Sequence, residues 1–556
     1  MPPNPALRIA ILINSTRIPE WQYQMLKKIQ LSGDGIIVLA VVRGKTDQST
    51  VVPVKSSLAL SLFSRYIIWD RKKFSQPPDP FAERTLDDLE GSIATLTLTP
   101  ETTRWDDSLS LNDIDTLLEH RADIIIRLGW RILKGRLLEL PRYGVWSFHH
   151  GDNQVNRGGP PGVWERYHGQ ICAGVTLQVL SEKLDDGFVL DRSFTATDKS
   201  SIKKTRDKLY WRSVDMLPRK LSELRQTGFD ALKERARSIG PPLSFYSQPL
   251  LSEKKMSLKH VLHYIGLGLY AYGKQVVFSR RFEEKWVLYF RLGDEMSTSI
   301  WQFTKIESPN DRYWADPFVI KREGIYYVFV EEYLYSKRRG RIAVIPVSEE
   351  GTVGEVKTVL EPDYHLSYPF LFEHDGQMYM IPESGENRTI DLYKCVSFPD
   401  QWVHVRTLMK DIYAVDTTLY EQEGRWWMFT NLRDTDGGNT HDELHLLSAD
   451  YFMDDEWTPH PQRVVVSDVR CARPAGALFK KNGRLFRPAQ DCSVDYGFAL
   501  QLQEITQLSE EHYQETPVSR ITPDWNNQVR GVHTFNHADG MTIVDAKTYI
   551  KKSDVI

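Results

Sequence analysis

After residue 310 the chain repeats one short pattern five times: an apolar strand, a polar turn that ends in glycine, and an aromatic or apolar strand. The turn glycines recur about every 50 to 60 residues, at Gly324, Gly376, Gly424, Gly483 and Gly540. Each follows Glu, Asp or Asn, and such pairs favour tight hairpins because glycine readily adopts positive φ. Five units of this size predict a five-bladed β-propeller whose inner strands lead into a central channel. A β-sandwich is the alternative.

The first part of the chain follows a different pattern. A strand-like run at 8–14 precedes a helical stretch at 20–30, and continuous apolar runs follow at 35–43 and 122–130. Continuous apolar strands that alternate with helices predict a doubly wound α/β domain with a sheet covered on both faces. We therefore expect three parts, which are an α/β domain over 1–237, a linker with one helical segment over 238–282, and an all-β propeller over 283–556.

The composition excludes several classes of protein. The net charge of −4 gives no basis for binding nucleic acid. The four cysteines include no CxxC pair, which argues against a zinc knuckle or a disulfide framework and favours a reducing compartment. The apolar runs at 9–13 and 261–273 are too short for a signal peptide core and a membrane span, respectively. We expect a cytoplasmic protein without a transmembrane segment. For 261–273, peripheral membrane contact is the alternative to a docking helix or linker.

Two adjacent histidines, His149 and His150, follow a strand-like stretch at 144–148. Neighbouring side chains on a strand point to opposite faces, so this pair does not predict a metal site. The next strand ends in a turn, 183–187, with two adjacent aspartates. A carboxylate from that turn can orient and charge an imidazole at the strand end, which predicts an acid/base site.

Four motifs follow one another in this region: Ser147-Phe148-His149, Arg157-Gly158-Gly159, Gly174-Val175-Thr176 and Leu184-Asp185-Asp186-Gly187. In this order they resemble the folate-dependent formyltransferases, which transfer a formyl group from N10-formyltetrahydrofolate to an amine. The resemblance covers residues 1–230 and implies that His149 stabilises the oxyanion and moves a proton, while Asp185 orients His149. It also implies a folate site formed by Arg127, Leu128, Gly129, Arg157 and Gly158.

One member of the motif differs, because Ser147 stands where the family has asparagine. Loss of one oxyanion donor typically lowers the rate by about 10²–10³. The domain is therefore either a working formyltransferase with an altered site or a degenerate one. His150 is a second donor or, as we favour, a solvated loop residue.

The propeller half has two resemblances. The sequence at 313–319, which includes Asp-Pro at 316–317, is similar to the first blade of glycoside hydrolase family 43, which implies that Asp316 projects into the channel as a base. Glu383 and Asp416 are expected to come from corresponding parts of the next repeats and to join Asp316 at one channel mouth. The stretches 473–497 and 531–536 resemble the N-terminal region of plant glucosamine inositolphosphorylceramide transferases more closely. Together these imply glycan binding, with hydrolysis or a scaffold role as alternatives.

The sequence thus predicts a formyltransferase that uses N10-formyltetrahydrofolate and acts on the amine of an amino sugar in surface-glycan biosynthesis. Its partners are an amino sugar or glycan, held by the propeller. The alternative function is a carbohydrate-binding or glycoside-hydrolysing propeller joined to a degenerate formyltransferase domain.

Overall fold

A computed structural model describes residues 5–45, 57–103, 106–155, 159–182, 188–239 and 257–555. The chain divides into two compact units, and each is described on its own. The first comprises residues 1–272 with 435–438, and the second comprises residues 273–434 with 439–556.

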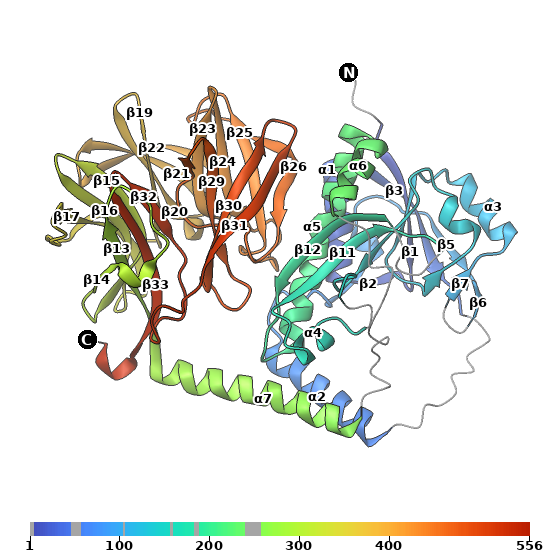
Figure 1. The fold of residues 1–556 in the computed structure, drawn as a ribbon. Helices are drawn as coiled ribbons and strands as arrows, with labels where there is room; N and C mark the ends of the chain where they lie inside the picture. The colour runs from blue at the N-terminus through green and yellow to red at the C-terminus, as the bar shows by residue number, and fades with distance from the viewer. Residues whose placement is uncertain are drawn as a thin grey trace. The chain divides into compact units, whose positions relative to one another are not determined.

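The first unit is built on a seven-stranded sheet in the order β12-β11-β10-β8-β1-β3-β5 (Figure 1). Its parallel part consists of β10 (Val145–His149), β8 (Ile124–Arg127), β1 (Leu7–Ile13), β3 (Gly35–Arg43) and β5 (Thr95–Leu98). The antiparallel strands β11 (Cys172–Val179) and β12 (Phe188–Ala196) extend it beyond β10.

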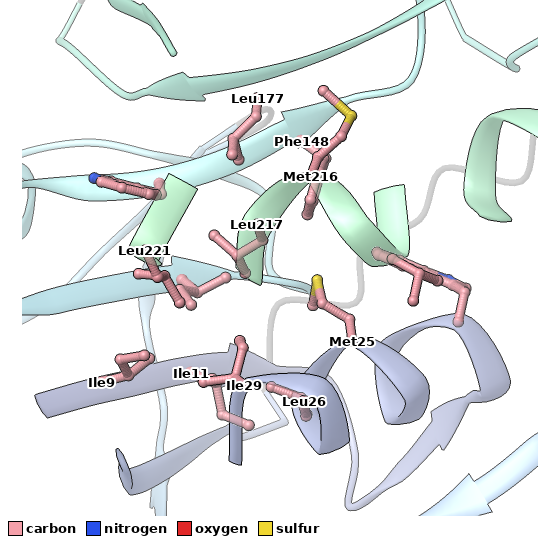
Figure 2. Close-up of a cluster of buried hydrophobic side chains, with 14 of the residues drawn as sticks. Ile9, Ile11, Met25, Leu26, Ile29, Phe148, Leu177, Met216, Leu217 and Leu221 are labelled. Carbon is pink, nitrogen blue, oxygen red and sulfur yellow. The ribbon is translucent and has the colours of Figure 1, made fainter. Parts of the chain in front are cut away.

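Helices cover both faces of this sheet, as the continuous apolar runs predict. On one face, α1 (Glu20–Ser32) and α5 (Ile202–Thr227) pack on β1 and β10 through a buried cluster that includes Met25, Leu217 and Ile11 (Figure 2). On the other face, α3 (Leu111–Glu119) buries Ile114 and Leu117 against the sheet. The predicted doubly wound fold is confirmed.

The remaining elements of this part are smaller or peripheral. Two small sheets pair β2 (Arg17–Pro19) with β4 (Glu83–Thr85), and β6 (Glu101–Thr102) and β9 (Ile132–Leu133) with β7 (Asp106–Ser108). The other helices are α2 (Leu58–Phe74), α4 (Val163–Tyr167), α6 (Phe229–Ile239) and α7 (Leu258–Arg281). Within the described ranges, no helix is both long enough and apolar enough to cross a membrane.

The second unit consists of five separate antiparallel sheets, which are the blades of a propeller. Three blades each consist of four strands that are consecutive in the sequence. The first contains β15 (Arg312–Arg322), β16 (Ile325–Leu334), β17 (Arg339–Ser348) and β18 (Lys357–Leu360), and the second contains β19 (Ser367–His374), β20 (Gln377–Ser384), β21 (Thr389–Ser397) and β22 (Gln401–Lys410). The third contains β23 (Ala414–Gln422), β24 (Arg425–Leu432), β25 (Glu443–Ala449) and β26 (Thr458–Ser467). The fourth contains β27 (Arg473–Pro474), β28 (Phe479–Lys481), β29 (Arg484–Asp491), β30 (Ala499–Leu508) and β31 (Tyr513–Ile521).

The fifth blade joins the two ends of the unit. It pairs β14 (Thr304–Ile306) and β13 (Phe282–Leu292) with β33 (Met541–Lys551) and β32 (Phe535–Ala538). Figure 1 shows the red C-terminal strands beside the green β13. Because one blade contains strands from both ends of the unit, hydrogen bonds between β13 and β33 close the ring of blades.

The turn glycines form the five hairpins that the repeat predicts. Their φ values lie between 70° and 93°, and the residues before them have φ values between 47° and 55°. Positive φ at both central residues is the type I′ geometry, which matches the twist of paired strands. Five such hairpins on five separate sheets confirm the propeller and exclude the sandwich.

Candidate functional site

The carboxyl edge of the parallel sheet brings three predicted residues together. His149 ends β10, and Ser147 lies two residues before it on the same strand. Arg127 ends β8 and lies directly beside Ser147 in the parallel register. Ligands of doubly wound folds bind at this edge. Asp185, Arg157 and Gly158 lie outside the described residues.

The Ser147 hydroxyl is buried and its hydrogen bonds are made within the chain. It accepts a hydrogen bond from Arg127 Nε at 3.0 Å and donates one to the Phe148 carbonyl at 3.3 Å. Arg127 Nη1 also donates to the Arg131 carbonyl at 2.8 Å. Ser147 therefore holds the guanidinium of Arg127 at this edge of the sheet.

The loop after β8 is hydrogen-bonded to the backbone of β1. The backbone N–H groups of Leu128 and Gly129 donate to the Leu12 carbonyl at 2.9 and 2.8 Å. A side chain at Gly129 would come within 2.7 Å of the Asn14 backbone, so the close approach requires glycine. The N–H groups of two predicted folate-binding residues are thus engaged inside the fold.

His150 is not the solvated loop residue that the sequence favoured. Its ring stacks on Tyr210 with centroids 3.8 Å apart, and its Nε2 lies 2.9 Å from Ser213 Oγ. Burial, with a smaller contribution from His149, lowers the pKa of His150 to about 3. The interpretation was wrong because α5, more than fifty residues later in the chain, covers this position.

In the propeller, two of the predicted carboxylates occupy the same position of their repeats. Asp316 and Asp416 lie eight residues before Gly324 and Gly424, each with φ of 51° at a register shift of the inner strand. Such a bulge re-aims side chains. Glu383 differs from the expectation because it lies on β20, the second strand of its blade.

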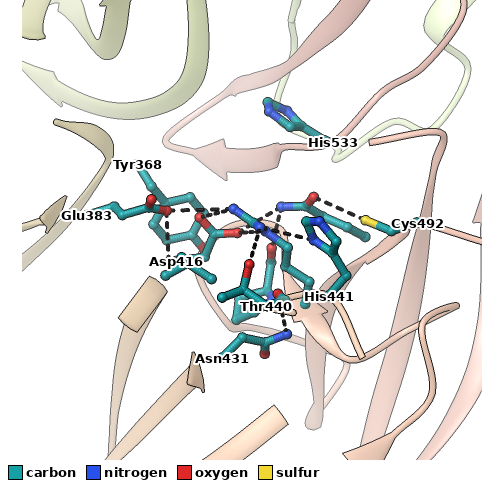
Figure 3. A network of polar contacts seen from close by, with 12 residues as sticks. Tyr368, Glu383, Asp416, Asn431, Thr440, His441, Cys492 and His533 are labelled. Atoms are coloured by element: carbon teal, nitrogen blue, oxygen red, sulfur yellow. Dashed lines mark hydrogen bonds and ion pairs between the residues drawn. The ribbon is translucent and has the colours of Figure 1, made fainter. Parts of the chain in front are cut away.

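One buried arginine joins Glu383 to Asp416 (Figure 3). Arg473 Nε lies 2.5 Å from Asp416 Oδ2, and Arg473 Nη2 lies 3.6 Å from Glu383 Oε2. The Gln490 amide donates to Asp416 at 2.9 Å. Burial opposes the charge on Arg473, but Asp416 and Glu383 outweigh it and raise its pKa. Burial, followed by the charge of Asp416, raises the pKa of Glu383 well above its usual range.

Asp316 belongs to a neighbouring group around His533. The Nδ1 of His533 lies 2.7 Å from Asp545 Oδ2, and its Nε2 lies 3.6 Å from Asp316 Oδ1. The Thr534 hydroxyl donates to Asp316 at 2.7 Å, and Trp286 stacks on His533 with centroids 3.8 Å apart. Asp316, His533 and Asp545 each offer one possible metal ligand, and these three ligand atoms lie within 4.8 Å of one another. In the geometry described, each His533 nitrogen faces a carboxylate instead.

The pKa values in this group are shifted together. Burial raises the pKa of Asp316 to about 6, although His533 opposes the shift. The charges of Asp545 and Asp316 raise the pKa of His533 against its burial. Near neutral pH an imidazolium between two carboxylates is the favoured charge state.

This raised pKa predicts a pH dependence of stability. The Asp316 carboxyl binds its proton more tightly in the folded protein than in the unfolded chain, so its contribution is present below pH 4 and is lost as the pH rises through about 6. The contribution of Asp316 to the free energy of unfolding should fall by about 2 kcal/mol between pH 4 and 7, and we expect Asp316→Asn to abolish this change. Urea unfolding at several pH values measures it, and an unchanged pH profile in the variant would contradict the assignment.

Comparisons with known proteins agree with this two-part architecture. The family model described as "Glucosamine inositolphosphorylceramide transferase 1, N-terminal" matches residues 301–548. Glucosamine inositolphosphorylceramide transferase 1 of Oryza sativa subsp. indica is 32% identical over 208 residues, which cover 37% of this chain and 28% of the relative. Methionyl-tRNA formyltransferase of Chlorobium limicola is 29% identical over 105 residues, which cover 19% of this chain and 33% of the relative.

Two solved structures align with parts of this chain at low TM-scores. Glycinamide ribonucleotide transformylase 1 from Symbiobacterium toebii aligns with a TM-score of 0.27 and 13% identity, over 40% of this chain and 88% of that one. The catalytic domain of the Coprinopsis cinerea GH62 α-L-arabinofuranosidase aligns with a TM-score of 0.33 and 11% identity, over 46% and 83%.

The chain therefore joins a formyltransferase-like α/β unit to a five-bladed propeller. The propeller resembles the N-terminal region of glucosamine inositolphosphorylceramide transferase 1, as the sequence predicted. The chain spans about a third or less of the length of the curated relatives named here.

Proposed function

We propose that the first unit transfers a formyl group from N10-formyltetrahydrofolate to the amine of an amino sugar, and that the propeller holds the glycan. The observation that carries the proposal is the placement of His149, Ser147 and Arg127 together at the carboxyl edge of the sheet. The formyltransferase relatives and the word glucosamine in the other relatives' names support it. No disulfide joins the four cysteines in the described part of the chain, and a reducing, cytoplasmic location is part of the proposal.

The residues at this edge fit the folate in part. Arg127, which is anchored by Ser147, offers a fixed cation there, whereas the Leu128 and Gly129 N–H groups donate to Leu12. Arg127 would therefore make the main contact on this side, together with Arg157 and Gly158. When bound, N10-formyltetrahydrofolate supplies the formyl carbon.

The chain's own residues manage charge and protons. As the acceptor nitrogen attacks the formyl carbon, His149 would hold a proton against the developing oxyanion. His149 would also serve the transfer of the proton that the amine loses to the folate nitrogen that leaves the formyl carbon. Asp185 would orient the imidazole of His149.

Ser147 offers a direct test of the altered motif. An asparagine at this position restores an N–H donor and still offers an oxygen to Arg127 Nε. We expect Ser147→Asn to leave the rate of formyl transfer unchanged or to raise it by up to about tenfold. Ser147→Ala, the matched control, should lower the rate because Arg127 loses its anchor. Formation of the N-formyl sugar, followed by mass spectrometry, measures both, and complete loss in Ser147→Asn would mean a site rebuilt for other chemistry.

The propeller site suits a sugar. Its carboxylates and Arg473 are groups that can exchange hydrogen bonds with the hydroxyl groups of a sugar. We expect the full-length protein to bind immobilised glycans without releasing sugars from them. A glycan array combined with a release assay measures both properties.

Glycoside hydrolysis is the second candidate function. It is favoured by the raised pKa of Asp316, about 6, because a carboxyl with a pKa in this range can exchange a proton at mildly acidic pH and act as a general acid or base. Robust sugar release that disappears in Asp316→Asn would establish hydrolysis and would overturn the binding proposal.

A further inference from the structure

A separate cavity of about 470 Å³ lies in the propeller where β13 begins and β16 ends. Its walls include Tyr313, Tyr333, Tyr335, Glu283, Glu284 and Arg338. None of these belongs to the predicted set of Asp316, Glu383 and Asp416. A cavity of this size accommodates a small ligand.

The three tyrosines form a fixed aromatic wall. The rings of Tyr313 and Tyr333 are stacked with centroids 4.8 Å apart and planes 6° from parallel. Tyr335 meets both rings edge-on, at 5.9 and 6.0 Å. The Tyr335 hydroxyl donates to the Glu284 carbonyl at 2.7 Å, which fixes the wall to β13. Rings held in this way lose little entropy when a ligand packs on them.

The Tyr313 hydroxyl differs from that of Tyr335. Within the described part of the chain it has no hydrogen-bond partner. Burial, together with the charges of Glu331 and Glu284, raises the pKa of Tyr313, so its hydroxyl stays protonated and can donate. The cavity thus contains an unused donor next to an aromatic wall.

Short contacts connect this cavity to the channel. Glu284 Oε1 accepts a hydrogen bond from Trp286 Nε1 at 2.6 Å. The ring of Trp286 stacks on His533, and His533 in turn faces Asp316. Glu284, which lines the cavity, is therefore linked through Trp286 to the group that contains Asp316.

The lining selects among classes of ligand. The lining contains two carboxylates, Glu283 and Glu284, and two cations, Arg338 and Lys552, and Lys552 is paired with Glu283 at 3.1 Å. Balanced charges of this kind disfavour a purely apolar group and give no net attraction for a phosphate or a carboxylate. Carboxylate acceptors, the Arg338 and Tyr313 donors and an aromatic wall together match a polyhydroxylated ring with one C–H face.

We propose that this tyrosine pocket is a subsite for a neutral or amine-bearing pyranose of the glycan held by the propeller. The proposal rests on the glycan-binding part of the proposed function. It adds a site outside the channel carboxylates and identifies the Tyr313 hydroxyl and the Tyr333 ring as its contacts.

Saturation-transfer NMR on the full-length protein tests the subsite, with the methyl glycosides of glucose, galactose, mannose and glucosamine as probes. We expect at least one probe to bind. Tyr313→Phe, which removes only the hydroxyl, should weaken that binding about three- to tenfold. Tyr333→Ala should weaken it by at least about tenfold. Tyr420→Phe, on the inner strand of the third blade, is the matched control and should bind as the wild type does.

The outcomes separate the two levels of the proposal. Wild-type affinity in both Tyr313→Phe and Tyr333→Ala would overturn the tyrosine subsite and leave glycan binding by the propeller in place. Failure of every methyl glycoside, together with an empty glycan array, would overturn both. Far-UV circular dichroism of each variant shows whether lost binding comes from lost folding, and Tyr313→Phe decides the matter if Tyr333→Ala does not fold.

Discussion

Replacing His149 with alanine is expected to lower the rate of formyl transfer by at least about 100-fold, because a positioned acid or base typically contributes 10²–10⁴-fold. His149 lies at the carboxyl end of β10 with its backbone paired to Thr176 of β11, so the sheet fixes the strand whatever side chain stands there. We therefore expect the variant to fold. Turnover of an amino-sugar acceptor, followed by mass spectrometry, measures the effect.

His120 is the matched control for this experiment. It belongs to the same unit but caps the C-terminus of α3, away from the strand that carries His149. His120→Ala should keep wild-type turnover. If His149→Ala also keeps it, the first unit does not use this histidine for acid/base chemistry, and the degenerate-domain alternative gains support.

The second large effect is on stability. Arg473→Met leaves the buried carboxylates of Asp416 and Glu383 without their cation, and breaking a buried ion pair in this way costs about 3–5 kcal/mol. Chemical denaturation of the propeller at pH 7 measures the loss. Arg484→Met removes an exposed ion pair with Glu504 from the same blade and should leave the free energy of unfolding close to that of the wild type.

The loss in Arg473→Met should depend on pH. Without the arginine, the carboxyl of Glu383 holds its proton more tightly in the folded protein than in the unfolded chain. Proton binding then favours folding as the pH falls, so the variant should recover part of its stability between pH 7 and 5. A destabilisation that is equal at both pH values would show that packing, rather than charge, is the main contribution of Arg473.

Local signals explain why so much of the fold could be predicted. Each hairpin is defined by two adjacent residues, such as Glu323 and Gly324, whose backbone conformations the residue types favour. The strands of the first unit were recognisable because a sheet covered on both faces needs continuous apolar runs, as at Ile9–Ile13. Each of these signals is carried by residues that are close together in the sequence.

The candidate sites were predicted less completely, because their contacts join distant segments. Asp316 was identified from its motif. Its partner Asp545 is 229 residues away in the sequence, and only the closed propeller brings the two residues together. Arg473 is the first residue of the stretch 473–497, and no neighbouring residue in the sequence indicates that it contacts Asp416. The position seven residues after each turn glycine, which holds Glu331, Glu383, Asn431, Gln490 and Lys547, was a usable signal that was missed.

The shared blade also determines when the propeller can be completed during synthesis. β13 pairs along its whole length with β33, from Phe282 with Lys551 to Leu292 with Met541. A ribosome that makes the chain from its N-terminus exposes β13 long before β33 exists. The fifth blade therefore stays incomplete, with the edge of β13 unpaired, until almost the entire chain has emerged. A nascent chain halted between residues 300 and 530 would carry an unpaired strand, and strands of this kind attract other chains.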